Sequence, residues 1–310
     1  MKQIHYLDLH EVPPASIGRF WLTLAHNNMG QSRVVPITVL QGKLPGPTLG
    51  ITTIVRDGAT DGIPLIHQLV EKVDVTKLRG TIICALLLDL PAVSPTSHGQ
   101  PDSNSYLGGV TAKLLDRLDY LINLRADSAD FTSIHTVHAD KRGRETALLI
   151  RPLDAPLIVN TPAVAGSLRA AAQWLNIPAV TMTLGQKRDL PLASIFRLLN
   201  DLDLLYQETD YRPSRTEDYR SACWIKTQAA GLLDVYTKAG EFVERGQVIA
   251  ELSDLFGRVM SRYTAPDDGV VVCRNGARLV AKGVGIVQLA IGGQSMRPMA
   301  ADPLANMVMV

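Results

Sequence analysis

Five side chains of types that bind metal ions lie within residues 98–138: three histidines and two aspartates. His98 and Asp102 lie four positions apart, and Asp130 precedes His135 and His138. Imidazole nitrogens and carboxylate oxygens are ligands of zinc, so these side chains would form a metal site if the fold brought them together. However, His135 and His138 lie in a polar stretch that we expect to be a loop, and their spacing suits few regular ligand pairs. We expect ordinary loop histidines here, with a relocated metal site as the alternative.

Patterns of other enzyme classes are missing from the sequence. Ser94, Ser97 and Ser105 are nucleophiles by type, but no Gly-x-Ser-x-Gly sequence occurs. There is no Gly-x-x-x-x-Gly-Lys phosphate-binding loop and no dinucleotide fingerprint. The three cysteines are widely spaced and form no Cys-x-x-Cys pair, which favours neither a disulfide framework nor a cysteine zinc site.

A strand, a loop and a helix follow one another early in the chain. Residues 48–55 form a short, β-branched stretch bounded by glycine and proline, which predicts a strand covered on both faces. Residues 56–62 hold two glycines and two aspartates, so the chain turns there, and residues 63–73 show apolar side chains at helical spacing. A second apolar strand over residues 81–88 completes a βαβ unit. The pattern therefore predicts a parallel sheet, whose sites lie at the carboxyl ends of its strands.

The rest of the chain continues this pattern and then changes. We predict a hairpin of two strands at the sheet edge, over residues 20–24 and 34–39, and further strands over 120–124, 146–150, 155–159 and 179–184. Helices are predicted over residues 110–118, 164–175 and 193–205. Between these elements we predict a long loop over residues 89–109, a polar loop over 127–144 and a linker over 206–219. Beyond about residue 221, short alternating segments separated by glycine predict an all-β module. We therefore predict an α/β domain over residues 1–220 and a β-rich, barrel-sandwich-like domain over 221–310.

Residues 45–70, PGPTLGITTIVRDGATDGIPLIHQLV, resemble the opening of the succinylglutamate desuccinylase/aspartoacylase family, zinc amidohydrolases related to zinc carboxypeptidases. The resemblance extends over nearly the whole chain. It implies an α/β fold like that of zinc carboxypeptidases, with a mixed, mostly parallel sheet flanked by helices and a C-terminal all-β domain. The C-terminal spacing is also similar to a lipoyl or biotinyl carrier barrel, but its hairpin, residues 252–257, has no lysine to modify.

The zinc ligands that the resemblance implies are replaced in this chain. Arg56 and Ala59 stand where the family has the His and Glu of its His-Gly-Asp/Asn-Glu loop, and Arg125 stands at the His that ends its third strand. A guanidinium has no lone pair to offer and a methyl group has none either. Thr183 replaces the glutamate that activates water, and its hydroxyl does not titrate near neutrality. Since a catalytic metal site acts as a unit, we expect no zinc chemistry and no cofactor.

The substrate-binding positions of the family are partly retained. Its Asp-Leu-Asn-Arg sequence corresponds to residues 102–105, so an Asp and an Asn are kept while the arginine becomes serine. The candidate ligand-binding residues are therefore Arg56, Arg125, Asn104, Asp102, Ser105 and Thr183.

Arg56 and Arg125 occupy two ligand positions of one metal site, so the fold should bring their side chains together. Two guanidiniums repel unless an anion lies between them. In one interpretation Asp57 or Asp102 pairs with the arginines and plugs the pocket. In the other, the arginines hold a carboxylate-bearing small molecule through bidentate hydrogen bonds.

The composition gives no sign of a nucleic-acid or membrane partner. There are 31 lysines and arginines against 30 aspartates and glutamates, and neither a signal-peptide segment nor a long apolar run occurs. We expect a cytoplasmic protein that is catalytically inactive and either binds a ligand or associates with itself or with an active relative. The apolar end, residues 307–310, is expected to dock on a protein surface or to be a disordered tail. The alternative is a metal-dependent hydrolase of amides or esters with an unrecognised site.

Overall fold

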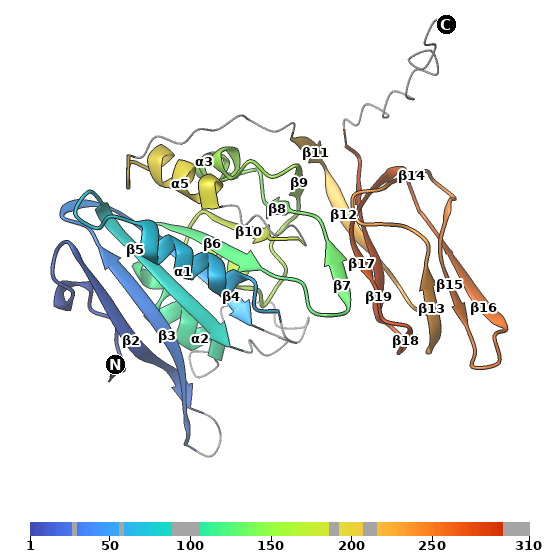
Figure 1. Cartoon of the computed structure of the whole chain (residues 1–310), viewed down its shortest axis with the longest axis horizontal. Helices are drawn as coiled ribbons and strands as arrows, with labels where there is room; N and C mark the ends of the chain where they lie inside the picture. Colours follow the sequence, from blue (N-terminus) through green and yellow to red (C-terminus); the bar gives the residue numbers. More distant parts are fainter. Residues whose placement is uncertain (27–29, 56–58, 89–105, 186–191, 207–215, 294–310) are drawn as a thin grey trace, which may run out of the picture.

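The computed structural model describes residues 1–26, 30–55, 59–88, 106–185, 192–206 and 216–293. Figure 1 shows a large sheet with helices on both faces and, beside it, a second part built of strands. The chain passes from the first part to the second between Tyr219 and Ser221, where one strand ends in the large sheet and the next begins in another sheet.

The large sheet is ten-stranded and mostly parallel. Its order is β1-β2-β3-β5-β4-β6-β10-β8-β9-β11, and its strands are β1 (Lys2–Ile4), β2 (Ser16–His26), β3 (Ser32–Gln41), β4 (Leu44–Val55), β5 (Arg79–Leu88), β6 (Tyr120–Arg125), β8 (Thr136–Ala139), β9 (Leu157–Asn160), β10 (Ala179–Thr183) and β11 (Glu217–Tyr219). The central strands β5, β4, β6 and β10 run parallel, while β3 pairs antiparallel with β5 and β8 with β10. The carboxyl ends of β4, β6 and β10 therefore meet at one edge.

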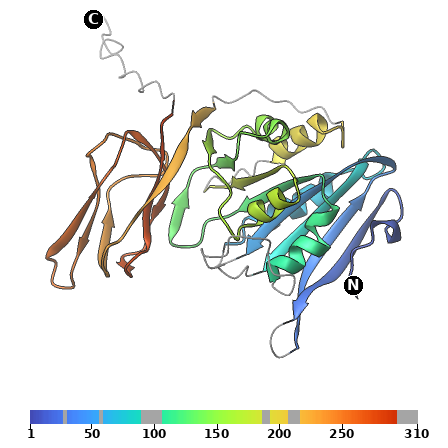
Figure 2. The same cartoon turned by 180° about the vertical axis from the view of Figure 1, so that it is seen from behind.

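Helices cover both faces of this sheet. They are η1 (Leu9–Glu11), α1 (Gly62–Lys72), α2 (Tyr106–Lys113), η2 (Leu115–Arg117), α3 (Arg144–Leu153), α4 (Leu168–Trp174) and α5 (Leu192–Asp201). Buried side chains of α1, α3 and α5, such as Leu65, Leu149 and Ile195, form one core with the sheet. Those of α2 and α4, such as Val110 and Leu168, form the other, which Figure 2 shows from behind. Within the described residues, no helix is long and apolar enough to cross a membrane.

The C-terminal part packs two antiparallel sheets around a core of its own. One sheet holds β12 (Ser221–Lys226), β19 (Gly285–Ile291), β17 (Gly269–Asn275) and β14 (Phe242–Val243), and the other holds β16 (Val259–Thr264), β15 (Val248–Ser253), β13 (Gly231–Val235) and β18 (Leu279–Val280). Fully buried side chains from both sheets, including Ile249, Leu252 and Val287, fill the space between them. Burial of this many aliphatic side chains is the main stabilising term of the module.

A short strand from the first part joins the sheet of the second part. β7 (Phe131–Ser133) pairs antiparallel with β17, so that Ser133 lies opposite Cys273. The amide of Ile134 also donates to the carbonyl oxygen of Val272 at 3.0 Å. The two parts of the chain are therefore connected through a shared sheet as well as through the chain itself (Figure 1).

The predicted architecture is confirmed. The strand, helix and strand expected over residues 48–88 are β4, α1 and β5, and β4 and β5 pair in parallel. The predicted hairpin is β2 and β3, and β1 lies outside it at the sheet edge. The fold class of a mostly parallel sheet with flanking helices and a C-terminal all-β region matches the structure.

Four local predictions are wrong. The predicted strand over residues 146–150 lies within helix α3, because Leu149, Ile150 and Leu153 form a buried stripe at helical spacing. The predicted polar loop over residues 127–144 contains β7 and β8, and the part of the predicted loop beyond residue 105 begins α2. The end of the predicted linker forms β11, which pairs with β9.

A candidate ligand-binding pocket

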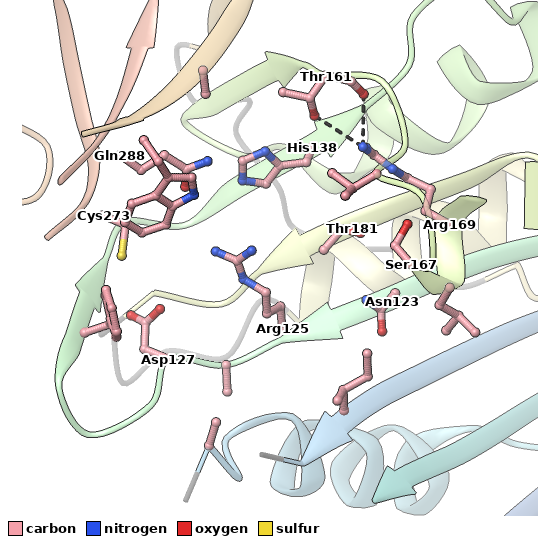
Figure 3. Close-up of a pocket in the computed structure, with 18 of the residues that line it drawn as sticks. Asn123, Arg125, Asp127, His138, Thr161, Ser167, Arg169, Thr181, Cys273 and Gln288 are labelled. Atoms are coloured by element: carbon pink, nitrogen blue, oxygen red, sulfur yellow. Dashed lines mark hydrogen bonds between the residues drawn. The ribbon is translucent and has the colours of Figure 1, made fainter. Parts of the chain in front are cut away.

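A cavity of about 680 Å³ lies at the carboxyl ends of the central strands, against the C-terminal part. Ile54 near the end of β4 and Ala59 beyond it border the cavity. Further lining side chains come from β6, β8, α4, β10, β12, β17 and β19, namely Asn123, Arg125, His138, Arg169, Thr181, Trp224, Cys273 and Gln288. Strands of a parallel sheet present their carboxyl ends together, and binding sites form there. This sheet edge supplies one wall and the β12–β19–β17 sheet supplies the other (Figure 3).

Arg125 ends strand β6 and extends into the cavity. Figure 3 shows its guanidinium in the space between His138 and Asp127. Its side chain is half-buried and makes no hydrogen bond or ion pair among the described residues. A guanidinium carries five N–H donors and stays charged, so Arg125 offers positively charged hydrogen-bond donors to a ligand that enters the cavity.

Arg169 is the second cation of the cavity and is 9% exposed. Its Nη2 donates to the carbonyl oxygens of Thr161 and Pro162 at 3.0 and 2.8 Å, and to Thr161 Oγ1 at 3.3 Å. These acceptors are neutral, and Nη1 has no hydrogen-bond partner among the described residues. Burial lowers the pKa of Arg169, while the charge of Asp140 acts in the opposite direction. The positive charge of Arg169 is thus only partly compensated.

His138 lies on β8 between β9 and β10 and is 7% exposed. Burial lowers its pKa to about 3, and the charges of Arg125 and Arg169 add to the effect. Since an imidazolium here would be desolvated and would face two cations, the ring is neutral at physiological pH. Its Nε2 has no hydrogen-bond partner in the described structure.

Asp127 is the acidic residue among the described side chains that line the cavity. Its carboxylate accepts a hydrogen bond from the backbone amide of Ser133 at 2.6 Å and another from the Ser133 hydroxyl. These bonds close the loop between β6 and β7. Next to them, Phe131 packs edge-on against Trp224 of the C-terminal part, with ring centroids 6.0 Å apart. Asp127 therefore supports the connection between the two walls of the cavity.

We predict that Asp127→Ala lowers the free energy of unfolding by about 1–3 kcal/mol, because the buried donors of Ser133 lose their acceptor. Chemical unfolding of the purified protein measures the change. Asp130→Ala is the matched control, since Asp130 is exposed and close in sequence, and it should change stability by less than about 0.5 kcal/mol. Equal losses in both variants would contradict the role assigned to Asp127.

The structure places some of the predicted site residues and not others. Arg125 lines the cavity together with Ala59, whose methyl group is buried. Thr183 lies opposite Arg125 in the pairing of β10 with β6, but it is fully buried and does not line the cavity. Its carbonyl oxygen accepts a hydrogen bond from His135 Nδ1 at 2.8 Å. The other predicted positions lie outside the described residues, namely Arg56, Asp57, His98, Asp102, Asn104 and Ser105, as does the apolar end at 307–310.

Arg169 and Gln288 were not predicted as site residues. Each is a polar side chain among buried apolar neighbours: Arg169 stands beside Leu168, Ala171 and Ala172 on α4, and Gln288 lies within the strand GIVQLAI. A single polar residue on the buried face of an amphipathic element is a signal that the sequence does contain. What it faces depends on the packing of the second part, which local pattern does not specify.

The described lining residues do not fit a zinc ion. Arg125 and Ala59 have no atom that binds zinc. Burial, together with the charge of Asp127, raises the pKa of the Cys273 thiol to about 12, so it is protonated and a poor ligand. Among the described residues, no three His, Cys, Asp or Glu side chains come together in a way that could hold a metal ion.

The chain has a mostly parallel sheet with helices on both faces, a cavity at the strand ends and an appended β region. Together these features define an α/β protein with a fold like that of zinc carboxypeptidases. No protein-family model and no curated protein matches the sequence. Solved structures do match. The product-bound ectoine utilization protein EutE (DoeB) from Ruegeria pomeroyi has 18% identity and a TM-score of 0.74, over 89% of this chain and 95% of that chain.

Two further similar structures carry the name of the family that the sequence resembles. The succinylglutamate desuccinylase/aspartoacylase from Rhodobacter sphaeroides has 17% identity and a TM-score of 0.71, covering 89% of this chain and 95% of that chain. An aspartoacylase family protein from Mesorhizobium loti has 16% identity and a TM-score of 0.68, covering 90% and 96%. At such identities the likeness shows the fold, and the predicted fold resemblance is confirmed over about nine-tenths of the chain.

Proposed function

We propose that this chain binds a carboxylate-bearing small molecule in the cavity and does not hydrolyse it through zinc. The observation that carries the proposal is the Arg125 guanidinium, which extends into the cavity without an anionic partner among the described residues (Figure 3). Two arginines and one aspartate are the charged side chains of the described lining, so the cavity favours an anion. A volume of about 680 Å³ suits a small molecule.

The described residues that line the cavity offer no histidine with an ordinary basicity. His138 is neutral, and its low pKa makes it a weak base. The Asp127 carboxylate accepts two hydrogen bonds from Ser133 and is thereby held in the loop between β6 and β7. Activation of a water molecule for attack on an amide needs a base whose pKa lies near the working pH. These features support binding over hydrolysis.

Calorimetry with a panel of acyl amino acids and dicarboxylates, each paired with its neutral methyl ester, tests the proposal. We expect saturable one-site binding of at least one acid, weakened about tenfold or more in the ester, because the charge-assisted bonds to arginine are lost. Elemental analysis of the same sample accompanies the titration. Binding of none of the acids would contradict the proposal, as would stoichiometric zinc together with amide hydrolysis.

Hydrolysis by a metal site that includes residues outside the described ranges is the second candidate function. It is favoured by the fold shared with proteins named as succinylglutamate desuccinylases. Association with copies of this chain or with an active relative, and a cytoplasmic location, stay predictions.

A further inference from the structure

Strand β16 forms an edge of the C-terminal part. It pairs with β15 on one side, and no described strand pairs with it on the other. The edge strands β14 and β18 are two residues long, whereas β16 has six residues and contains neither lysine nor proline. Short length, lysine and proline are features that prevent pairing at a sheet edge. In Figure 1, β16 lies on the side of the C-terminal part that faces away from the large sheet, so another chain can reach it.

The hairpin between β15 and β16 exposes apolar side chains at and near its turn. Leu255 is 77% exposed and Phe256 is 96% exposed, while Val259 and Met260 at the start of β16 are 45% and 43% exposed. The turn is fixed, because the Asp254 carboxylate accepts hydrogen bonds from two of its backbone amides at 2.9 Å each. Single exposed apolar residues are ordinary, but four of them together on a fixed hairpin indicate a contact surface.

The backbone of β16 also presents hydrogen-bonding groups on its outer side. The amide and the carbonyl oxygen of Ala265 both bond to residues 246–247, at 2.9 and 2.8 Å, so they face β15. Alternate residues of an antiparallel strand face the same neighbour, so Ser261 faces β15 as well. The first irregularity of this pairing adds a residue to β15 only, and the second lies beyond Ser261. The amide of Arg262 and the carbonyl oxygen of Met260 therefore point away from β15.

The charges of β16 select one register for pairing with a second copy of the chain. Antiparallel pairing of a strand with its own copy is two-fold symmetric, as the commonest homodimers are. A register centred on Arg262 places two arginines opposite each other, which destabilises a sheet. A register centred on Ser261 places Arg262 opposite Met260 of the second copy, and Arg258 opposite Thr264. The Arg262 amide then donates to the Met260 carbonyl oxygen of the other copy, and the two-fold axis repeats the bond.

We propose that two copies of this chain associate through β16, paired antiparallel about Ser261, so that their two β16–β15–β13–β18 sheets become continuous. The turn of each copy, with Leu255 and Phe256, then lies beside Ala265 and Pro266 of the other copy. Its apolar side chains are removed from water, which stabilises the dimer. The proposed surface is separate from the cavity, so the inference does not depend on the proposed function.

The charges around this surface favour a second copy over an ionic partner. Arg262 bonds to Glu251 at 2.7 Å, and Arg278 forms an ion pair with Asp234 on the same sheet. These charges are neutralised within the chain and do not call for a charged partner. The whole chain has a net charge of +1, so two copies repel each other little.

Light scattering of the purified chain tests the association, and we expect the mass of a dimer. Arg262→Pro removes the outward amide without removing a bond to β15, and it should give a monomer. Arg262→Gln keeps that amide and should stay dimeric. Phe256→Ser should raise the dissociation constant of the dimer by about tenfold or more. Leu279→Ser is its control, because Leu279 is 69% exposed at the opposite edge of the same sheet, and it should change the constant by less than about twofold.

A crosslink tests the register without depending on a disruptive variant. Residues at position 261 of the two copies would form a non-hydrogen-bonded pair with Cα atoms about 4.5 Å apart, which a disulfide spans. Ser261→Cys should therefore give a disulfide-linked dimer with oxidised glutathione. Thr264→Cys, exposed on the same strand but facing Arg258, should not. The native protein, in which Cys223 is partly exposed, gives the background.

Two results would overturn the proposal. The first is a monomeric native protein. The second is a dimer that persists in Arg262→Pro and does not crosslink in Ser261→Cys, because the two copies would then associate through a different surface.

Discussion

Replacement of Arg125 by glutamine is expected to weaken carboxylate binding by about 30- to 1000-fold, or about 2–4 kcal/mol. The guanidinium extends into the cavity, and its N–H donors have no described partner that a ligand would have to displace. Glutamine keeps one N–H donor pair but removes the charge and the fork geometry. Arg125→Lys, which keeps the charge alone, should lose less than Arg125→Gln. Calorimetry with the best acid of the panel measures both changes.

The stability of the variant distinguishes the two interpretations of Arg125. If the guanidinium is unpaired in the ligand-free protein, its loss should leave the free energy of unfolding unchanged or raise it, since an unpaired half-buried charge is removed. If Asp57 or Asp102 pairs with it and plugs the pocket, Arg125→Gln should destabilise the protein and no acid should bind. Arg262→Gln is the matched control, because that arginine is exposed and bonded to Glu251 in the C-terminal part. It should change neither quantity appreciably.

The sheet and one wall of the cavity could be predicted from the sequence. Strands β4, β5, β6 and β10 are short apolar runs bounded by turn residues, and such runs are buried because each one covers its neighbours. Since parallel strands end at one edge, the sequence alone assigns a residue at the end of a predicted strand to that edge. Arg125 is such a residue, and the structure places it in the cavity.

The opposite wall could not be predicted. Trp224, Cys273 and Gln288 lie in strands whose alternation predicts a β module, but nothing local says which face of that module meets the first part. The orientation depends on β7, three residues long, which pairs with β17 at a separation of more than a hundred positions. A strand so short carries no periodic signal, and its pairing is set by tertiary contacts.

The prediction for His138 is wrong for a related reason. Its neighbours in the sequence are polar enough to suggest a loop, yet β8 is inserted antiparallel beside β10 and parallel to β9, which buries four residues in a row. Burial inside a sheet changes the chemistry of the histidine more than its sequence context does. The ring becomes a neutral hydrogen-bonding group instead of an exposed base.

The same burial makes His138 a source of acid sensitivity. In the unfolded chain its pKa is near the ordinary value of 6.5, whereas burial and the two arginines hold it at about 3 in the folded protein. Between these values the unfolded state binds the extra proton, so stability falls as the pH falls. The slope from this one group approaches about 1.4 kcal/mol per pH unit below pH 6.5. From pH 6.5 to pH 4.5 the loss is about 2–3 kcal/mol, a large share of the stability of a typical protein.

We predict that His138→Gln, which cannot take up this proton, flattens the pH dependence of unfolding by that amount. Urea unfolding at pH 7, 6, 5 and 4.5 measures the free energy for the native protein and the variant, and the difference between the two curves removes contributions such as that of Asp140, whose pKa of about 2 is unaffected. His67→Gln serves as the control, because His67 is exposed on α1 and should leave the curve unchanged. Parallel curves for the native protein and His138→Gln would show that the imidazole takes up its proton in the folded state and is not neutral there.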